Sequence, residues 1–263
     1  MKREIEYKKY EQRGADFHYK KIKKSVLGDF SAYIYARYYL ELQILNKIIA
    51  KFQNTNEKLK ILDIGCGDAV FINMIYLMHN KKKLELYGID SSSIAIEAAK
   101  IRNPNAIFKV ANVYNLPFED NYFDIIVSSD VIEHILEPNK MLMEIKRTAK
   151  NNSFVIIGTP IKFTEFPFDK MHSHEFFPNE FKNFLTTFFF NVKIVESHNL
   201  LNLLLYEKYY YLFFKKRALY RYLINFLTIY FNRNPFLKIK SKNDKKEFYT
   251  YMFGIGSIKK KEV

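Results

Sequence analysis

Two carboxylates and two glycines are crowded into one short segment, Asp63-Ile-Gly-Cys-Gly-Asp68, and this pattern suits a ligand-binding turn. Gly65 and Gly67 permit a tight turn and let a ligand touch the backbone. A pyrophosphate would need the start of the following helix to be free of negative charge, and the dinucleotide fingerprint has a third glycine that is missing here. The acidic turn therefore favours a cationic ligand over a dinucleotide.

One histidine, His134, follows an apolar segment that has the pattern of a buried strand. Ligands of parallel sheets bind beyond the carboxyl ends of the strands, so we expect His134 to lie near a substrate. The pKa range of histidine suits a general base, which makes His134 a candidate catalytic residue. The alternative is a structural histidine that begins a helix, and we expect Asp130 and Glu133 to be helix-capping groups.

A His-x-His pair, His172 and His174, lies in the loop after the next predicted strand. Such a pair can indicate a metal site, but further ligands would have to come from His198 or from loop carboxylates, so we expect no metal. His172 is instead the second candidate catalytic residue, either touching the substrate or belonging to a lid. The single cysteine, Cys66, excludes an internal disulfide and a zinc site built from cysteines.

Short apolar segments with the length of buried strands alternate with helical patterns of about ten residues. This alternation is typical of an α/β fold in which a doubly wound parallel sheet carries helices on both faces. The predicted strands are 59–64, 84–89, 107–110, 123–128 and 154–157, and the predicted helices are 31–53, 69–78, 94–101 and 139–149.

The motifs at the ends of these strands resemble those of one enzyme family. Asp63-Ile-Gly-Cys-Gly-Asp68 is similar to motif I of the class I methyltransferases that use S-adenosylmethionine (SAM), a cation that carries an amino acid and a ribose, and Tyr87-Gly-Ile-Asp90 resembles their second motif. Further matches resemble the subgroup that includes quinone-biosynthesis and glycan-cluster methyltransferases. They are Asn112-Val-Tyr-Asn-Leu-Pro-Phe118, the segment from Phe123-Asp to Glu133-His134, Gly158-Thr-Pro160, and His172-Ser-His-Glu-Phe-Phe177.

This resemblance covers about residues 58–197, with a last strand at 249–258. It implies a Rossmann-like, doubly wound sheet of seven strands, mostly parallel with an antiparallel last strand. SAM is the implied cofactor, with its ribose hydroxyls on Asp90 and its adenine beside Asn112, which stands where the family usually has Asp. The residues that the resemblance implies for cofactor binding are Asp63, Gly65, Cys66, Gly67, Asp90, Ser91, Asn112, Val113, Ser128 and Ser129.

The net charge of +14 is concentrated outside the predicted core, because residues 31–197 are neutral and residues 198–248 carry +8. The latter segment also holds 13 aromatic residues and predicts two helices with a break near residues 215–217. It suits a membrane interface, a lid or a dimer surface, whereas nucleic acid is disfavoured. We therefore divide the chain into an N-terminal arm and helical cap (1–57), a SAM-binding core (58–197), a helical insertion (198–248), and a last strand with a basic tail (249–263).

These observations predict a SAM-dependent methyltransferase. A cytoplasmic location is expected because no apolar segment reaches the roughly 20 residues of a membrane span and no signal peptide is apparent. The subgroup and the insertion together favour O-methylation of a sugar in surface-glycan or lipid-linked oligosaccharide (polysaccharide) biosynthesis, at the inner face of the membrane. The alternatives are methylation of an isoprenoid quinone or similar lipid, and a non-catalytic SAM-binding scaffold. Expected partners are a small-molecule or glycan acceptor, an anionic membrane, or a second copy of the chain.

Overall fold

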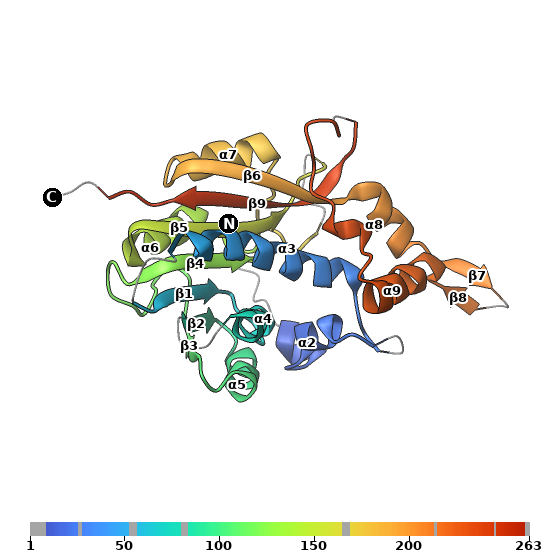
Figure 1. Cartoon of the computed structure of the whole chain (residues 1–263), viewed down its shortest axis with the longest axis horizontal. Coiled ribbons are helices and arrows are strands. Elements are labelled where there is room, and N and C mark those ends of the chain that lie inside the picture. Colours follow the sequence, from blue (N-terminus) through green and yellow to red (C-terminus); the bar gives the residue numbers. More distant parts are fainter. Residues whose placement is uncertain are drawn as a thin grey trace.

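A seven-stranded mixed sheet forms the centre of the computed structural model (Figure 1), which describes residues 9–25, 28–52, 57–79, 84–164, 169–212, 215–244 and 246–260. Its strands are β1 (Leu59–Ile64), β2 (Leu84–Asp90), β3 (Ile107–Val110), β4 (Phe123–Ser129), β5 (Ala149–Pro160), β6 (Phe190–Asn199) and β9 (Tyr249–Ser257). The strand order is β3-β2-β1-β4-β5-β9-β6, and β9 runs antiparallel to both of its neighbours. The predicted fold class, Rossmann-like and mostly parallel with an antiparallel last strand, is confirmed.

Helices cover both faces of the sheet and explain why the central strands are apolar on both sides. One buried cluster joins strand residues to α3 (Ala32–Ile49), α4 (Val70–Met78) and α5 (Ser93–Arg102). A second cluster, on the other face, includes residues of α6 (Pro138–Thr148) and α7 (Pro178–Thr186). The chain leaves β1 toward β2 on one side and reaches β4 on the other, so the switch point of the sheet lies between β1 and β4.

The N-terminal arm, with α1 (Lys9–Arg13) and α2 (Phe17–Ile22), is held against the beginning of α4 and the end of α5. The Tyr19 backbone N–H donates to the Asp68 carboxylate at 2.9 Å, and Arg102 of α5 pairs with Asp16 at 2.7 Å. Arg102 also donates to the backbone carbonyl of Asp68. The carboxylate of Asp68, in the glycine turn, and the ion pair of Arg102 with Asp16 therefore hold the arm in place.

The segment between β6 and β9 contains α8 (Leu200–Glu207), β7 (Tyr210–Leu212), β8 (Lys215–Arg217), α9 (Leu219–Phe231) and a short 3-10 helix, η3 (Pro235–Leu237). The two helices were expected, but the break between them is a β-hairpin of β7 and β8. A third buried cluster packs α8, α9 and η3 against the start of α3, with Phe30, Ala32, Tyr206, Ile224 and Phe236 at its centre.

Figure 1 shows α8, α9 and the hairpin projecting from the end of the sheet toward which the parallel strands run. Within the described ranges, no helix is both long enough and apolar enough to cross a bilayer.

Candidate active site

A cavity of about 520 Å³ opens at the carboxyl ends of β1, β2 and β4, beside the switch point of the sheet. The structure brings most of the predicted site residues to its wall, together with groups from the N-terminal arm and α3 that the sequence did not predict. The predicted residues that line it are Asp63, Gly65, Cys66, Asp90, Ser91, Asn112, Val113, Ser129 and His134. The unpredicted ones include Tyr10, His18, Tyr38, Glu41, Tyr114 and Met171.

The glycine turn is shaped by backbone geometry that few side chains tolerate. Gly65 and Gly67 have φ angles of +75° and +55°, and a Cβ at Gly65 would collide with the Val131 side chain. The backbone N–H groups of Gly65 and Cys66 both donate to the carbonyl of Ile89, at 2.8 and 2.9 Å, so the turn is fixed to β2. Gly65 therefore leaves room at the cavity wall that any other residue would fill.

Two other predicted residues support the turn from outside the cavity wall. The Gly67 backbone N–H donates to the Asp90 carboxylate at 2.9 Å. Ser128 is buried, and its hydroxyl donates to the Ile64 carbonyl at 3.1 Å. Gly67 and Ser128 thus hold β1, the turn and Asp90 in position.

Asp63 and Asp90 give the cavity its negative charge. Burial, and secondly the charge of Asp90, raises the pKa of Asp63 to about 7. The other carboxylate oxygen of Asp90 accepts from the Ser92 backbone N–H at 2.9 Å, so each of its oxygens already takes one backbone donor. A carboxylate oxygen can accept more than one hydrogen bond, which suits Asp90 to a ligand that carries hydroxyl groups.

The second carboxylate of the glycine turn, Asp68, does not line the cavity. It is fully buried and turned toward the arm, where it accepts from Tyr19 and lies 3.5 Å from both His18 and Arg102. Of the two carboxylates in the glycine turn, only Asp63 therefore lines the cavity. Asp90 takes the place of Asp68 as the second acidic group at the cavity wall.

A further carboxylate, that of Glu41 in α3, forms part of the cavity wall. It is buried, accepts a hydrogen bond from the Ser129 hydroxyl, and has a pKa raised well above its usual value, chiefly by burial. Its signal in the sequence was a single carboxylate among the apolar residues Leu40, Leu42, Ile44 and Leu45. A charged residue in such a stretch indicates a functional position, because burying an unpaired charge is costly.

Asn112 and Val113 follow β3 and lie at the cavity wall next to Tyr114. The Asn112 side-chain carbonyl accepts from the Tyr114 backbone N–H at 2.9 Å, which fixes a local turn. The Tyr114 hydroxyl in turn accepts from the backbone N–H groups of Leu136 and Glu137, at 3.1 and 3.2 Å. These contacts tie the segment after β3 to the segment after β4.

Two predicted catalytic residues meet at the other end of the site. The rings of His134 and His172 are 5.0 Å apart, and His134 lines the cavity whereas His172 lies behind it. The Nδ1 atom of His134 is 3.1 Å from the Met171 carbonyl, and that of His172 is 2.6 Å from the Glu175 carboxylate. The loop after β5 therefore supplies a hydrogen-bond acceptor to each ring.

Asp130 and Glu133 are not the helix caps that we expected. Asp130 forms an ion pair with Arg37 of α3 at 2.7 Å. Glu133 is buried beside the two histidines and accepts from the Thr159 hydroxyl at 3.1 Å. Burial, and secondly the charge of Asp130, raises the pKa of Glu133 to about 8.

Two other histidines that the sequence analysis considered, His174 and His198, point elsewhere. His174 lies 3.1 Å through Nε2 from the Leu136 carbonyl, so the His-x-His pair does not converge on one point. His198 is fully buried against Ser197 and the Tyr33 carbonyl, and burial lowers its pKa to about 3. Neither residue shares the position of His134 and His172.

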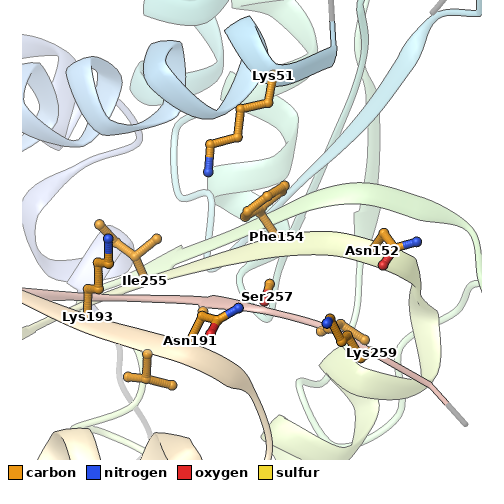
Figure 2. A pocket seen from close by; sticks show the side chains of 11 residues that line it. Lys51, Asn152, Phe154, Asn191, Lys193, Ile255, Ser257 and Lys259 are labelled. Atoms are coloured by element: carbon orange, nitrogen blue, oxygen red, sulfur yellow. The ribbon is translucent and has the colours of Figure 1, made fainter.

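A second hollow, of about 580 Å³, lies at the opposite end of the sheet, where β5 and β6 begin and β9 ends. Figure 2 shows Lys51, Lys193 and Lys259 around it, with Phe154 below the Lys51 side chain. Among the described residues, the polar side chains that line it are those of lysine, asparagine and serine. Neither a carboxylate nor the glycine turn belongs to this lining. The candidate binding and catalytic residues described above lie at the other end of the sheet, beyond the carboxyl ends of β1, β2 and β4.

The comparisons with known proteins agree with this site and fold. Residues 55–218 match the family described as Methyltransferase domain, which is more than half of the chain. A C-methyltransferase of ubiquinone and menaquinone biosynthesis from Campylobacter jejuni is 34% identical over 110 residues, or 41% of this chain and 46% of its own length. An uncharacterised Methanocaldococcus jannaschii protein is 31% identical over 140 residues, or 53% and 54%. The matches span about half the length of these curated relatives.

Solved structures show the same architecture at low sequence identity. A Haemonchus contortus phosphoethanolamine N-methyltransferase in complex with SAM superimposes with a TM-score of 0.60 at 14% identity, covering 99% of this chain and 61% of that one. A Bacillus subtilis protein, YcgJ, gives 0.54 at 17% identity, covering 86% of this chain and 100% of its own. The family match over residues 55–218, together with this fold, identifies a methyltransferase domain. The chain belongs to the class I SAM-dependent methyltransferase family.

Proposed function

We propose that this protein transfers a methyl group from SAM to a hydroxyl group of an acceptor. The observation that carries the proposal is that Asp63 and Asp90, at the ends of two neighbouring strands, both line the cavity. The glycine turn between these strand ends has positive φ angles and leaves the cavity wall open. The residues present fit a ligand that joins a cation to a ribose. When bound, SAM supplies a methyl group that is already activated by a sulfonium.

Each part of the cavity then has a role in cofactor binding. Asp63, with Glu41 and Ser129 near it, would hold the cationic amino-acid end. Asp90, with Ser91, would accept hydrogen bonds from the ribose hydroxyls. Asn112 and Val113 would lie along the adenine. Cys66 packs within the turn, and Gly67 and Ser128 keep the turn in register.

The acceptor would lie at the end of the cavity where His134 and Met171 form the wall. Methyl transfer requires the acceptor oxygen to be close, aligned and deprotonated, and much of the rate comes from that positioning. We propose that His134, with His172 beside it, activates a hydroxyl there. A sugar hydroxyl, which has a high pKa, needs such activation more than an amine does.

The insertion supports an acceptor that is attached to a lipid. Large apolar side chains on α8 and α9 are exposed at the end of the sheet that holds the cavity, among them Leu204, Leu223, Phe226, Tyr230 and Phe231. Such a surface, in a segment with a charge of +8, suits the interface of an anionic membrane. We propose a sugar in surface-glycan or lipid-linked oligosaccharide biosynthesis, methylated at the inner face of the membrane. An isoprenoid quinone is the second candidate, favoured by the Campylobacter relative.

The test is a His134→Ala variant of the full chain, assayed for SAM affinity by calorimetry, for melting temperature, and for formation of S-adenosylhomocysteine with lipid and glycan extracts. We expect SAM affinity and melting temperature to be retained while turnover falls by about 10²–10⁴. Parallel loss of stability and activity would show that His134 is structural. Wild-type protein that binds SAM but produces no S-adenosylhomocysteine with any extract would support the non-catalytic scaffold instead.

A further inference from the structure

Glu133, His134 and His172 form a compact group of side chains at the acceptor end of the cavity. Each offers one ligand atom, and the three atoms lie within 4.8 Å of one another. Two of the residues follow β4 and the third comes from the loop after β5, so the group is assembled by the neighbouring ends of two paired strands. Bonds of about 2.0–2.2 Å to a shared cation would require only small side-chain movements.

Both imidazole rings are oriented by hydrogen bonds at Nδ1. The acceptors are the Met171 carbonyl for His134, at 3.1 Å, and the Glu175 carboxylate for His172, at 2.6 Å. A proton on each Nδ1 satisfies these acceptors and places the lone pair of each ring on Nε2. Metal-binding histidines typically donate their second N–H to a carboxylate or a carbonyl in this way.

The third member, Glu133, is fixed between β5 and the His172 loop. Only 1% of Glu133 is exposed, and its carboxylate accepts from the Thr159 hydroxyl at 3.1 Å. Its backbone carbonyl accepts from the N–H groups of Ser173 and His174, at 2.6 and 3.2 Å, so the histidine loop is tied directly to this residue. A buried carboxylate is strongly stabilised by a positive partner, and a cation held by both histidines would be one.

We propose that Glu133, His134 and His172 bind one divalent transition-metal cation, of the Zn²⁺ or Mn²⁺ kind, at the acceptor end of the cavity. Two imidazoles and one carboxylate suit such cations better than Mg²⁺, which prefers oxygen ligands. Three protein ligands leave coordination positions open for an acceptor, and one of the three residues, His134, lines the cavity. This assignment replaces the sequence-based expectation of no metal, which considered His172 with His174 rather than with His134.

The inference rests on the proposed function and specifies how the hydroxyl is activated. A hydroxyl oxygen that binds the cation loses its proton more readily, because the positive charge stabilises the oxyanion. The proton passes to water, the oxygen forms one bond to the methyl carbon, and the carbon–sulfur bond breaks with its electron pair left on sulfur. His134 then acts as a ligand and not as the direct proton acceptor.

The test uses the tag-free full chain, stripped with EDTA and titrated with Co²⁺, whose visible absorption reports its ligands, and with Zn²⁺ by calorimetry. We expect one equivalent to bind, and we expect His172→Ala and Glu133→Gln to weaken binding by at least about 100-fold. Glu175→Gln, which alters the hydrogen bond that positions His172, should weaken it by about 10–100-fold. His174→Ala is the matched control from the same loop and should bind as the wild type does.

Failure of the wild type to bind Co²⁺ and Zn²⁺ stoichiometrically would overturn the proposal, as would equal binding by His172→Ala and His174→Ala. Melting temperatures identify any variant that has lost its fold, and Glu133→Gln keeps the shape of the site if His172→Ala does not fold. SAM affinity is measured in the same stripped protein. Loss of SAM binding in the wild type would refute the proposed function, whereas turnover that is unchanged in EDTA would refute the cation alone and leave direct proton acceptance by His134.

Discussion

At the scale of single residues, Asp90 carries the most specific part of the cofactor proposal. Its two oxygens accept from the backbone of Gly67 and Ser92, so the carboxylate is held in one orientation toward the cavity. Asp90→Ala removes this acceptor, and hydrogen bonds to a charged group are worth about 1.5–3 kcal/mol. We expect SAM affinity to fall by about 10- to 150-fold in calorimetry, with Ser93→Ala, at the exposed start of α5, as the control. Unchanged affinity would remove the ribose assignment.

Asp63 gives the site a pH dependence. Its pKa is raised to about 7 by burial and by Asp90, so the carboxyl of the ligand-free protein is protonated below that pH. A cationic ligand binds the charged form, and SAM affinity should therefore rise with pH between 5.5 and 7, by up to tenfold per unit, and then level off. The same raised pKa makes the ligand-free protein less stable as the pH rises toward 7. The reason is that the unfolded state releases the Asp63 proton at a lower pH than the native state does.

Asp63→Asn should abolish the rise in SAM affinity and raise the melting temperature at pH 8, in the absence of ligand, by a few degrees. Glu41→Gln is the matched control, since Glu41 is the other buried carboxyl group of the cavity wall, and it should keep the rise near pH 7. If the pH dependence disappears with Glu41→Gln and persists in Asp63→Asn, the two residues have been assigned the wrong roles.

At the scale of elements, the N-terminal arm closes the cofactor cavity. Tyr10 and His18 form part of its wall, and the Tyr10 hydroxyl accepts from the Asp68 backbone N–H at 3.2 Å. Arg102 fastens the arm through Asp16 and lies 4.4 Å from the centre of the Tyr19 ring. We therefore expect the arm to slow the release of a ligand from this cavity.

Arg102→Ala should therefore speed SAM dissociation, by about tenfold or more if the lost charged hydrogen bonds stabilise the closed arm by at least 1.5 kcal/mol. Stopped-flow measurement gives the rate, and trypsin should cut the lysine-rich arm faster in this variant. Lys100→Ala, an exposed residue of the same helix, is the control. Equal dissociation rates and equal cleavage in the two variants would show that the arm does not retain the ligand.

The elements were predictable where their signal is local. The central strands β1 and β4 are short apolar runs because helices cover both faces of the sheet, and Leu59–Ile64 was predicted with its observed bounds. The pairing of β7 with β8 was missed because a run of aromatic residues fits a strand as well as a helix. The arm was missed because its contact, Tyr19 with Asp68, joins residues 49 positions apart and leaves no local pattern. The sequence predicted His134 and His172 as separate candidates. That they lie together beside Glu133 depends on how the loops after β4 and β5 fold, which no local pattern shows.

At the scale of the whole molecule, the insertion presents an apolar face. Tyr222, Phe226 and Tyr230 occupy successive turns of α9 and are between 43% and 62% exposed. Burying such side chains in the headgroup region gains about 1.5–3 kcal/mol each at most, and the basic residues of the insertion add attraction to anionic lipid. We expect the protein to co-sediment with anionic phospholipid vesicles at low salt, weakly with neutral ones, and less as salt is raised.

Replacing Tyr222, Phe226 and Tyr230 by Ser should reduce vesicle binding by at least tenfold, whereas Ile101→Ser, at an exposed apolar residue of α5, should not change it. Light scattering in the same experiment reports the oligomeric state. A protein that ignores the vesicles and is dimeric, with a monomeric triple-serine variant, would show that α9 is a dimer surface and would end the membrane interpretation.

The position of the insertion between β6 and β9 has an evolutionary consequence. Asn199 and Tyr249, which bound it, are paired across the two strands, so the 49 residues between them leave and re-enter the sheet at adjacent points. A segment attached in this way can be lengthened, shortened or exchanged while the register of the sheet is kept, because the cost of closing a loop grows only slowly with its length. Exchanging this one contiguous stretch would therefore change what lies beside the cavity, while the strand ends of β1, β2 and β4 that form the cavity stay as they are.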